Sequence, residues 1–278
     1  MSGRLYLCGT PIGNLSDFSP RAVETLRSVD LIAAEDTRHS LKLLRHFEIS
    51  KPMVSYFEHN KRERGEQLMQ KLLAGESIAL ITDAGMPAIS DPGEDLVRLC
   101  HAHGIPVSPI PGPCAAVSAL AAGGLPTGRF CFEGFLTVNK KGRREHLESL
   151  RGEERTMIFY EAPHKLTATL GDMLRILGDR RLALAREMTK LHEEIVNTTL
   201  SQALAHYEDT PPKGEFVLIV EGCGKQEQTF AQSPAERLEE LISSGVPKKD
   251  AIRQVASERQ LPKREVYALA LAREEEGN

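Results

Sequence analysis

The segment at residues 5–15, LYLCGTPIGNL, constrains the fold more than any other part of the chain. A short run of β-type residues leads directly into Gly9, Pro11 and Gly13, which is the pattern of a strand that ends in a tight loop. Such a loop lets a ligand approach bare backbone. Its sequence matches neither G-x-G-x-x-G of dinucleotide sites nor G-x-x-x-x-G-K-[ST] of nucleoside triphosphate sites. It therefore predicts a site for a small ligand of another kind.

The same design occurs twice more. A predicted strand at residues 77–82 runs into the loop 83–93, DAGMPAISDPG, and another at 105–110 runs into residues 111–118, PGPCAAVS. In an open α/β sheet, ligands bind outside the carboxyl ends of the strands. Glycine and proline also mark ordinary turns, but three such loops together favour a shared binding crevice.

Strands and helices alternate over residues 4–122, which predicts a mostly parallel sheet covered on both faces. The turn-rich stretch 122–128 is a candidate domain boundary. Beyond it the predicted strands lie closer together, and the short gap between those at 181–186 and 194–200 suits an antiparallel hairpin. We therefore expect a second α/β domain with a mixed sheet.

The end of the chain predicts a small helical module. A polar linker at residues 222–232 precedes three short amphipathic helices at 234–243, 248–259 and 263–276, which resemble a helix-turn-helix unit. The predicted domains are thus 1–122, 123–222 and 233–278. Basic residues outnumber acidic ones between residues 248 and 264, which indicates either nucleic-acid binding or a merely solvated face.

Composition excludes several classes of protein. The formal net charge of -4 gives no overall attraction to nucleic acid, so such binding requires local patches. No apolar run approaches the ~20 residues of a membrane span. The five cysteines are scattered, as in reduced cytoplasmic proteins. The nine histidines lack metal-ligand spacing, so we expect no metal.

The three loops resemble those of the tetrapyrrole methylase family, the class III S-adenosylmethionine methyltransferases. Four further motifs, EDTR at 35–38, YEAPHK at 160–165, REMTKLHEE at 186–194 and GEFV at 214–217, are similar to the branch that methylates the ribose 2′-hydroxyl of a cytidine in small-subunit (16S) ribosomal RNA. The resemblance implies two α/β domains with S-adenosylmethionine in the cleft between them, an appended helical module, a homodimer, and ribosomal RNA or the small ribosomal subunit as partner.

The resemblance also implies which residues bind the methyl donor. Carried over position by position, they are Pro11, Asp83, Gly85, Met86, Ser90, Ala115, Ala116, Phe159, Ala185 and Phe216.

A ribose hydroxyl is a poor nucleophile and needs a base or a cation beside it. Glu35 or Asp36 could act as the base, and Arg38 could grip an RNA phosphate. The alternative is that Asp36 only caps the helix that follows. Lys190, with a lowered pKa or as a cation, could act on the hydroxyl, or it could belong to a charged surface hairpin.

Two basic segments are candidates for binding RNA phosphates. Lys140, Lys141, Arg143 and Arg144 lie in a predicted loop, and Lys248, Lys249 and Arg253 lie in the helical module. Basic segments are often only solvated, so this is a hypothesis. Two other functions remain open: a methylase of a small tetrapyrrole, which has little use for these segments, and a non-enzymatic nucleic-acid-binding protein, which leaves the three loops unexplained.

Overall fold

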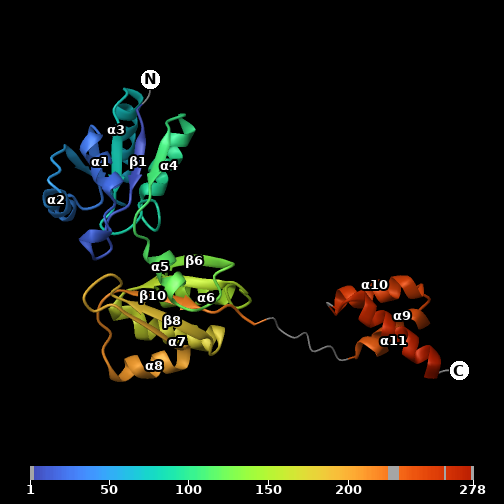
Figure 1. The fold of residues 1–278 in the computed structure, drawn as a ribbon. Helices are drawn as coiled ribbons and strands as arrows, with labels where there is room; N and C mark the ends of the chain where they lie inside the picture. Colours follow the sequence, from blue (N-terminus) through green and yellow to red (C-terminus); the bar gives the residue numbers. More distant parts are fainter. Residues whose placement is uncertain (1–2, 225–231, 260, 277–278) are drawn as a thin grey trace. The chain divides into compact units, whose positions relative to one another are not determined.

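The computed structural model describes residues 3–224, 232–259 and 261–276. The chain forms two compact units, Met1–Gly224 and Lys225–Asn278, which Figure 1 traces in sequence colours. Most of the predicted linker, residues 225–231, lies outside the described residues. Within the described ranges, no helix combines the length and apolar character that a membrane span needs. The predicted domain limits stay predictions.

The first sheet of the larger unit has five strands in the order β3-β2-β4-β1-β5. They are β1 (Leu5–Cys8), β2 (Leu31–Ala34), β3 (Met53–Ser55), β4 (Ile78–Ile81) and β5 (Val107–Ile110). Every pairing is parallel, as predicted. The three loops rich in glycine and proline follow β1, β4 and β5, which are neighbours, so all three leave from one edge of the sheet.

Helices cover both faces of this sheet because successive strand residues point to opposite faces. Leu31 and Ala33 of β2 pack in one core with α3 (Lys61–Leu73) and α4 (Gly93–Ala102). Ile32 and Ala34 face the other core. That core is closed by α1 (Pro20–Ser28) and α2 (Thr37–His46), as Figure 1 shows.

The second sheet is mixed, with the order β6-β7-β10-β8-β9. Its strands are β6 (Phe130–Phe135), β7 (Thr156–Glu161), β8 (Arg181–Arg186), β9 (Glu194–Thr199) and β10 (Phe216–Val220). Only β6 and β7 pair in parallel among the described strands of this sheet. The predicted hairpin is formed by β8 and β9, and the predicted fold class is confirmed.

One face of the second sheet carries α6 (Lys140–Ser149), α7 (Leu166–Leu177) and α8 (Leu200–Asp209), and the other carries α5 (Ala115–Ala122). Helix α8 was not predicted, since the preceding strand was expected to reach Leu200. The prediction of a loop at residues 139–144 is wrong. The side chain of Asn139 accepts hydrogen bonds from the backbone of Lys141 and Gly142, so α6 begins at Lys140.

The smaller unit consists of α9 (Pro234–Ser243), α10 (Lys248–Glu258) and α11 (Lys263–Glu276). Ser233 and Glu236 form a reciprocal capping box that fixes the start of α9. Leu241, Val255 and Val266 meet in the core of the unit. The predicted helices are confirmed, with α10 ending one residue early, and the helix-turn-helix interpretation stays a prediction.

Arg143 joins α6 to α7 inside the second half of the larger unit. Its Nε and Nη2 atoms donate to Asp172 Oδ2 at 2.9 and 2.6 Å, and Arg144 Nε donates to Oδ1 at 3.0 Å. Burial by itself would raise the pKa of Asp172, but the hydrogen bonds from the two arginines outweigh it and lower the pKa. Arg143 is therefore a buried packing residue and not a surface cation.

We expect Arg143→Met to lower the free energy of unfolding by about 2–4 kcal/mol, because the buried Asp172 loses two hydrogen bonds. Lys140→Met, at the exposed start of the same helix, should change it by less than about 0.5 kcal/mol. Urea denaturation of both variants measures the difference, and equal effects would contradict the packing role.

Candidate active site

A cavity of about 480 Å³ opens at the edge of the first sheet where the three loops meet. Its size lies in the ~300–1,000 Å³ range of small-molecule sites. It is lined by Ile12 of the first loop, by most of residues 82–91, and by Cys114 and Ala115 of the third. Strands and turns of the second sheet complete it. The predicted residues that line it are Glu35, Asp83, Gly85, Met86, Ser90, Ala115, Ala185, Lys190 and Phe216.

Backbone contacts bind the three loops to one another. Thr10 N donates to Gly85 O at 2.9 Å, and Gly85 N donates to Thr10 O at 3.2 Å. On the other side, a Cβ atom on Gly9 would lie 2.7 Å from the Cα atom of Gly112. Neither Gly9 nor Gly112 has room for a side chain, so the first and third loops meet through backbone. The Thr10 hydroxyl adds bonds to the end of β4 and to the second loop, donating toward Thr82 O at 3.1 Å and Gly85 O at 3.3 Å.

The second loop is held in an unusual backbone conformation. Ala88 and Ser90 have φ angles of 67° and 64°, a region that side chains disfavour. Asp91 Oδ1 stabilises the turn by accepting hydrogen bonds from Ala88 N at 3.0 Å and Gly93 N at 2.7 Å. Asp91 Oδ2 is buried, with no hydrogen-bond partner in the described part of the chain.

Three carboxylates, Glu35, Asp83 and Asp91, line the first-sheet side of the cavity. Glu35 Oε2 accepts from Thr82 Oγ1 at 2.5 Å and from Asp83 N at 3.4 Å. Burial, followed by the charge of Glu35, raises the pKa of Asp83. Burial also raises the pKa of Asp91, against hydrogen bonds from Gly93 and Ala88. This wall suits a cationic ligand.

Lys190 faces the cavity from the turn between β8 and β9. Its Nζ atom lies 2.8 Å from Glu187 Oε1 and 2.8 Å from Glu215 Oε2. Burial alone would lower the pKa of Lys190, but the bonds to Glu187 and Glu215 outweigh it and raise the pKa. The structure thus holds Lys190 as a cation.

Glycines on two sides make room for this arrangement. A Cβ atom on Gly13 would lie 2.5 Å from Lys190 Cγ, and one on Gly214 would lie 2.4 Å from Glu187 Cγ. Glu187 Oε1 also accepts from Glu215 N at 2.9 Å. Lys190 therefore sits in a fixed frame against the first loop.

An aromatic pair lies on the second-sheet side of the cavity. The ring centroids of Phe135 and Tyr160 are 5.4 Å apart, and both residues line the cavity. Ala116 N donates to the Tyr160 hydroxyl at 3.1 Å, which satisfies a free backbone N–H in the first turn of α5. Burial raises the pKa of Tyr160 to about 12, so the hydroxyl stays protonated.

Asp91, Phe135 and Glu215 line the cavity but were not among the predicted site residues. Asp91 and Glu215 stand inside the motifs at residues 83–93 and 214–217. Their proximity to Ser90 and Phe216 was a usable signal. Phe135 ends a strand that carried no loop motif, and we find no sequence signal for it.

Several predicted site residues lie outside the cavity lining. Pro11 and Ala116 are buried beside it, and Phe159 is fully buried in the opposite core because alternate residues of β7 point to opposite faces. Asp36 caps α2 by accepting from Arg38 N at 2.8 Å, and the Arg38 side chain is 91% exposed. The structure brings Glu35 and Lys190 to the cavity but not Asp36 or Arg38.

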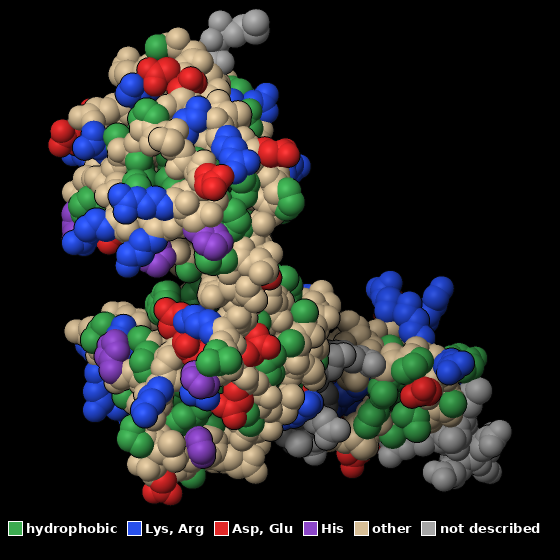
Figure 2. Space-filling model, turned by 60° about the vertical axis from the view of Figure 1, so that its left-hand side comes forward, with side chains coloured by type: hydrophobic (Ala, Val, Ile, Leu, Met, Phe, Trp, Pro, Cys, Tyr) green, Lys and Arg blue, Asp and Glu red, His purple; other side chains and the backbone are tan. Residues whose placement is uncertain are grey.

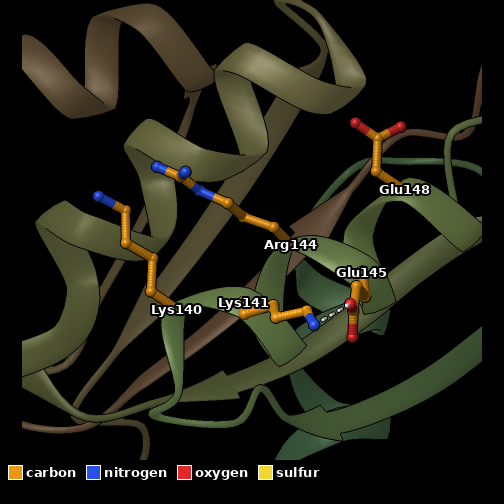
Figure 3. A pocket seen from close by; sticks show the side chains of 5 residues that line it. All are labelled: Lys140, Lys141, Arg144, Glu145 and Glu148. Atoms are coloured by element: carbon orange, nitrogen blue, oxygen red, sulfur yellow. Dashed lines mark ion pairs between the residues drawn. The ribbon is translucent and has the colours of Figure 1, made fainter.

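Of the residues predicted to bind RNA, Lys140, Lys141 and Arg144 project from the first turns of α6. Figure 3 shows them, with Lys141 Nζ 3.7 Å from Glu145 Oε1. Arg143 is the exception because it is buried.

On α10, Lys249 and Arg253 are exposed and Lys248 is partly exposed. Arg253 lies 3.3 Å from Asp250. RNA binding by these residues stays a prediction. Across residues 3–224, 232–259 and 261–276, no His, Cys, Asp and Glu side chains gather as a metal site requires.

Gly214→Ala should lower the free energy of unfolding by about 2–4 kcal/mol, because position 214 combines a φ angle of 84° with the clash against Glu187. Gly104→Ala is the matched control. Its φ angle is 67° and its Cβ atom would meet nothing within 4 Å, so only about 1–2 kcal/mol is expected. Thermal and urea denaturation measure the loss of unfolding free energy in both variants. Equal losses would show that the Glu187 side chain can move aside at no cost.

Comparison with known proteins agrees with this geometry. The model of the family Tetrapyrrole (Corrin/Porphyrin) Methylases matches residues 4–204. Ribosomal RNA small subunit methyltransferase I of Synechocystis sp. is 50% identical over 278 residues, covering 99% of this chain and 100% of the relative. The protein of the same name from Halalkalibacterium halodurans is 51% identical, covering 95% and 93%.

Solved structures share the fold at low sequence identity. Uroporphyrin-III C-methyl transferase from Thermus thermophilus, complexed with S-adenyl homocysteine, has a TM-score of 0.55 and 21% identity, covering 78% of this chain and 97% of that one. Diphthine synthase has a TM-score of 0.59 and 12% identity, covering 79% and 90%. The chain belongs to the tetrapyrrole methylase family and, within it, to the ribosomal RNA small subunit methyltransferase I family.

Proposed function

We propose that this protein transfers a methyl group from S-adenosylmethionine to the ribose 2′-hydroxyl of a cytidine in small-subunit (16S) ribosomal RNA. One observation carries the proposal: relatives named for methylation of small-subunit ribosomal RNA match nearly the whole chain at about half identity. The cavity supports it, since an acidic wall, a fixed lysine and an aromatic pair meet there.

The lining of the cavity fits the methyl donor. S-adenosylmethionine, when bound, supplies a methyl group on a positively charged sulfur, which an oxygen nucleophile can attack in line. Asp83 would pair with the ammonium group of the donor, and backbone at Ala115 would position its methionine part. Ala185 and Phe216 would pack against the adenosine. The three carboxylates favour the cationic donor over its neutral-sulfur product, which helps the product leave.

Glu35 and Lys190 are the residues that we propose for the chemistry. Glu35 lines the cavity and is oriented by Thr82 and Asp83 N, so it can accept the proton of the ribose hydroxyl. Lys190, held as a cation by Glu187 and Glu215, stabilises the negative charge that develops on that oxygen. Asp36 and Arg38 lie outside the lining, and we assign them no chemical step.

The basic residues of α6 and α10 are proposed to contact RNA phosphates, namely Lys140, Lys141, Arg144, Lys248, Lys249 and Arg253. We also propose that the protein works as a homodimer in the cytoplasm, where its ribosomal substrate is found.

Acidification should weaken donor binding through Asp83. Burial and the charge of Glu35 raise the pKa of Asp83 above its ordinary value of 3.8. As the pH falls, the carboxylate is therefore protonated earlier than a free aspartate, and it can then no longer form an ion pair with the ammonium group of the donor. Asp83→Asn should bind S-adenosylmethionine about 10- to 100-fold more weakly at neutral pH. It should also lose that part of the pH dependence. Isothermal titration calorimetry at several pH values tests this, and an unchanged affinity in Asp83→Asn would exclude the assignment.

Replacing Lys190 should slow the methyl transfer without loosening the donor. We expect Lys190→Met to reduce the single-turnover rate about 10²–10³-fold, the effect of losing one preorganised charge. The dissociation constant of S-adenosylmethionine should stay within about threefold, and Lys190→Arg should recover part of the rate. A parallel loss of rate and donor affinity would instead indicate a structural role.

The function itself is tested with labelled S-adenosylmethionine and purified small ribosomal subunits that lack their own modifications. Naked RNA and uroporphyrinogen serve as parallel substrates. We expect label at one site of the subunit RNA, where the chain resists alkaline cleavage. Label in uroporphyrinogen alone would overturn the proposal in favour of a small-molecule methylase.

A further inference from the structure

The exposed face of α2 is entirely basic, apart from one leucine. Ser40 and Leu44 point into the protein. Arg38, Lys42 and Arg45 are exposed, and their spacing of four and three residues puts them on one face of the helix. His39 and His46 are also exposed, and no acidic residue stands between Thr37 and His46. Figure 2, which turns the side of α2 forward, shows Lys, Arg and His side chains gathered on this part of the larger unit.

This face begins at the rim of the cavity. The residues before α2 are Glu35, which lines the cavity, and Asp36, whose backbone N donates to Asp83 Oδ1 at 3.2 Å. The helix then runs away from the cavity, advancing about 1.5 Å per residue. A polymer bound along the helix would therefore have one end at Glu35 and Asp83.

Acidic residues stand among the cations on the opposite face of the same sheet, whereas α2 contains none. On α3 and α4, Lys61 and Arg98 are paired with Asp95 and Lys71 with Glu76, and Arg62 and Arg64 stand on either side of Glu63 in the sequence. On α2, only Arg38 has an ion pair among the described residues, at 3.4 Å from Asp36. Lys42 and Arg45 have none in that part of the chain. Cations without ion pairs favour an anionic partner, because binding it does not require an existing ion pair to break.

We propose that Arg38, Lys42 and Arg45 form a docking surface for the phosphate backbone of the ribosomal RNA next to the target nucleotide. This proposal rests on the proposed function and deepens it. Phosphate contacts fix the position and register of a nucleic acid without reading its sequence. Here they would align the strand so that one ribose enters the cavity beside Glu35 and Lys190.

The test uses the full-length double variant Lys42→Gln/Arg45→Gln, which leaves the cavity untouched. Binding of small ribosomal subunits lacking the modification is measured at several KCl concentrations, together with methyl transfer and calorimetric binding of S-adenosylmethionine. We expect about tenfold weaker subunit binding. The slope of log affinity against log salt should fall by about 1.4, since each phosphate contact to a single strand contributes about 0.7. Donor affinity should not change.

The matched control is Lys71→Gln/Arg98→Gln, which removes the same charge from the opposite face of the sheet. It should bind subunits as the parent protein does. Equally weak subunit binding by both double variants would show that only net charge matters and would overturn the proposal. Subunit binding by the α2 variant at the level of the parent protein would also overturn it. A parent protein that methylates no RNA refutes the proposed function instead, and the binding series separates that result from failure of the docking surface.

Discussion

Gly9 and Gly112 lie against each other at the ends of β1 and β5, and the distance between these strands leaves no space for a side chain at either position. The hydrogen bonds between Thr10 and Gly85 tie the first loop to the end of β4 on its other side. The loops after three neighbouring strands thus become one rigid edge. The cavity depends on that edge, because its first-sheet side is made almost wholly of these loops.

Much of this could be predicted from sequence because it depends on local pattern. Alternating strands and helices indicate a parallel sheet, and a serine, a proline and a glutamate mark the start of α9. The start of α6 was missed for a local reason too. Gly142 and a run of charged residues are typical of a loop, although the cap at Asn139 starts a helix there. The burial of Arg143 was hidden because its partner, Asp172, stands on another helix 29 residues away.

The cavity could be predicted only in part. Loop residues such as Asp83 and Ala115 stand in motifs, but the frame around Lys190 unites a turn between β8 and β9 with Glu215 and Gly13, which are distant in sequence. Phe159 was wrongly predicted to lie at the cavity. It is next to Tyr160 in the sequence, but its side chain faces the opposite core. Which side of a strand meets the cavity depends on how the sheet packs, and a motif alone does not carry that information.

The junction between β2 and α2 links the cavity to the basic face of α2, through hydrogen bonds among four residues. Glu35 and Asp36 are tied to Thr82 and Asp83 by hydrogen bonds, and the helix that follows carries the basic face. If RNA binds the proposed surface and moves α2, the movement would reach Glu35 and Asp83, the carboxylates that we propose for the active site. Thermodynamic linkage then makes the effect reciprocal: whatever factor RNA contributes to donor affinity, the donor contributes to RNA affinity. Such coupling would let the occupancy of the cavity at one end of α2 alter RNA binding along the rest of the helix.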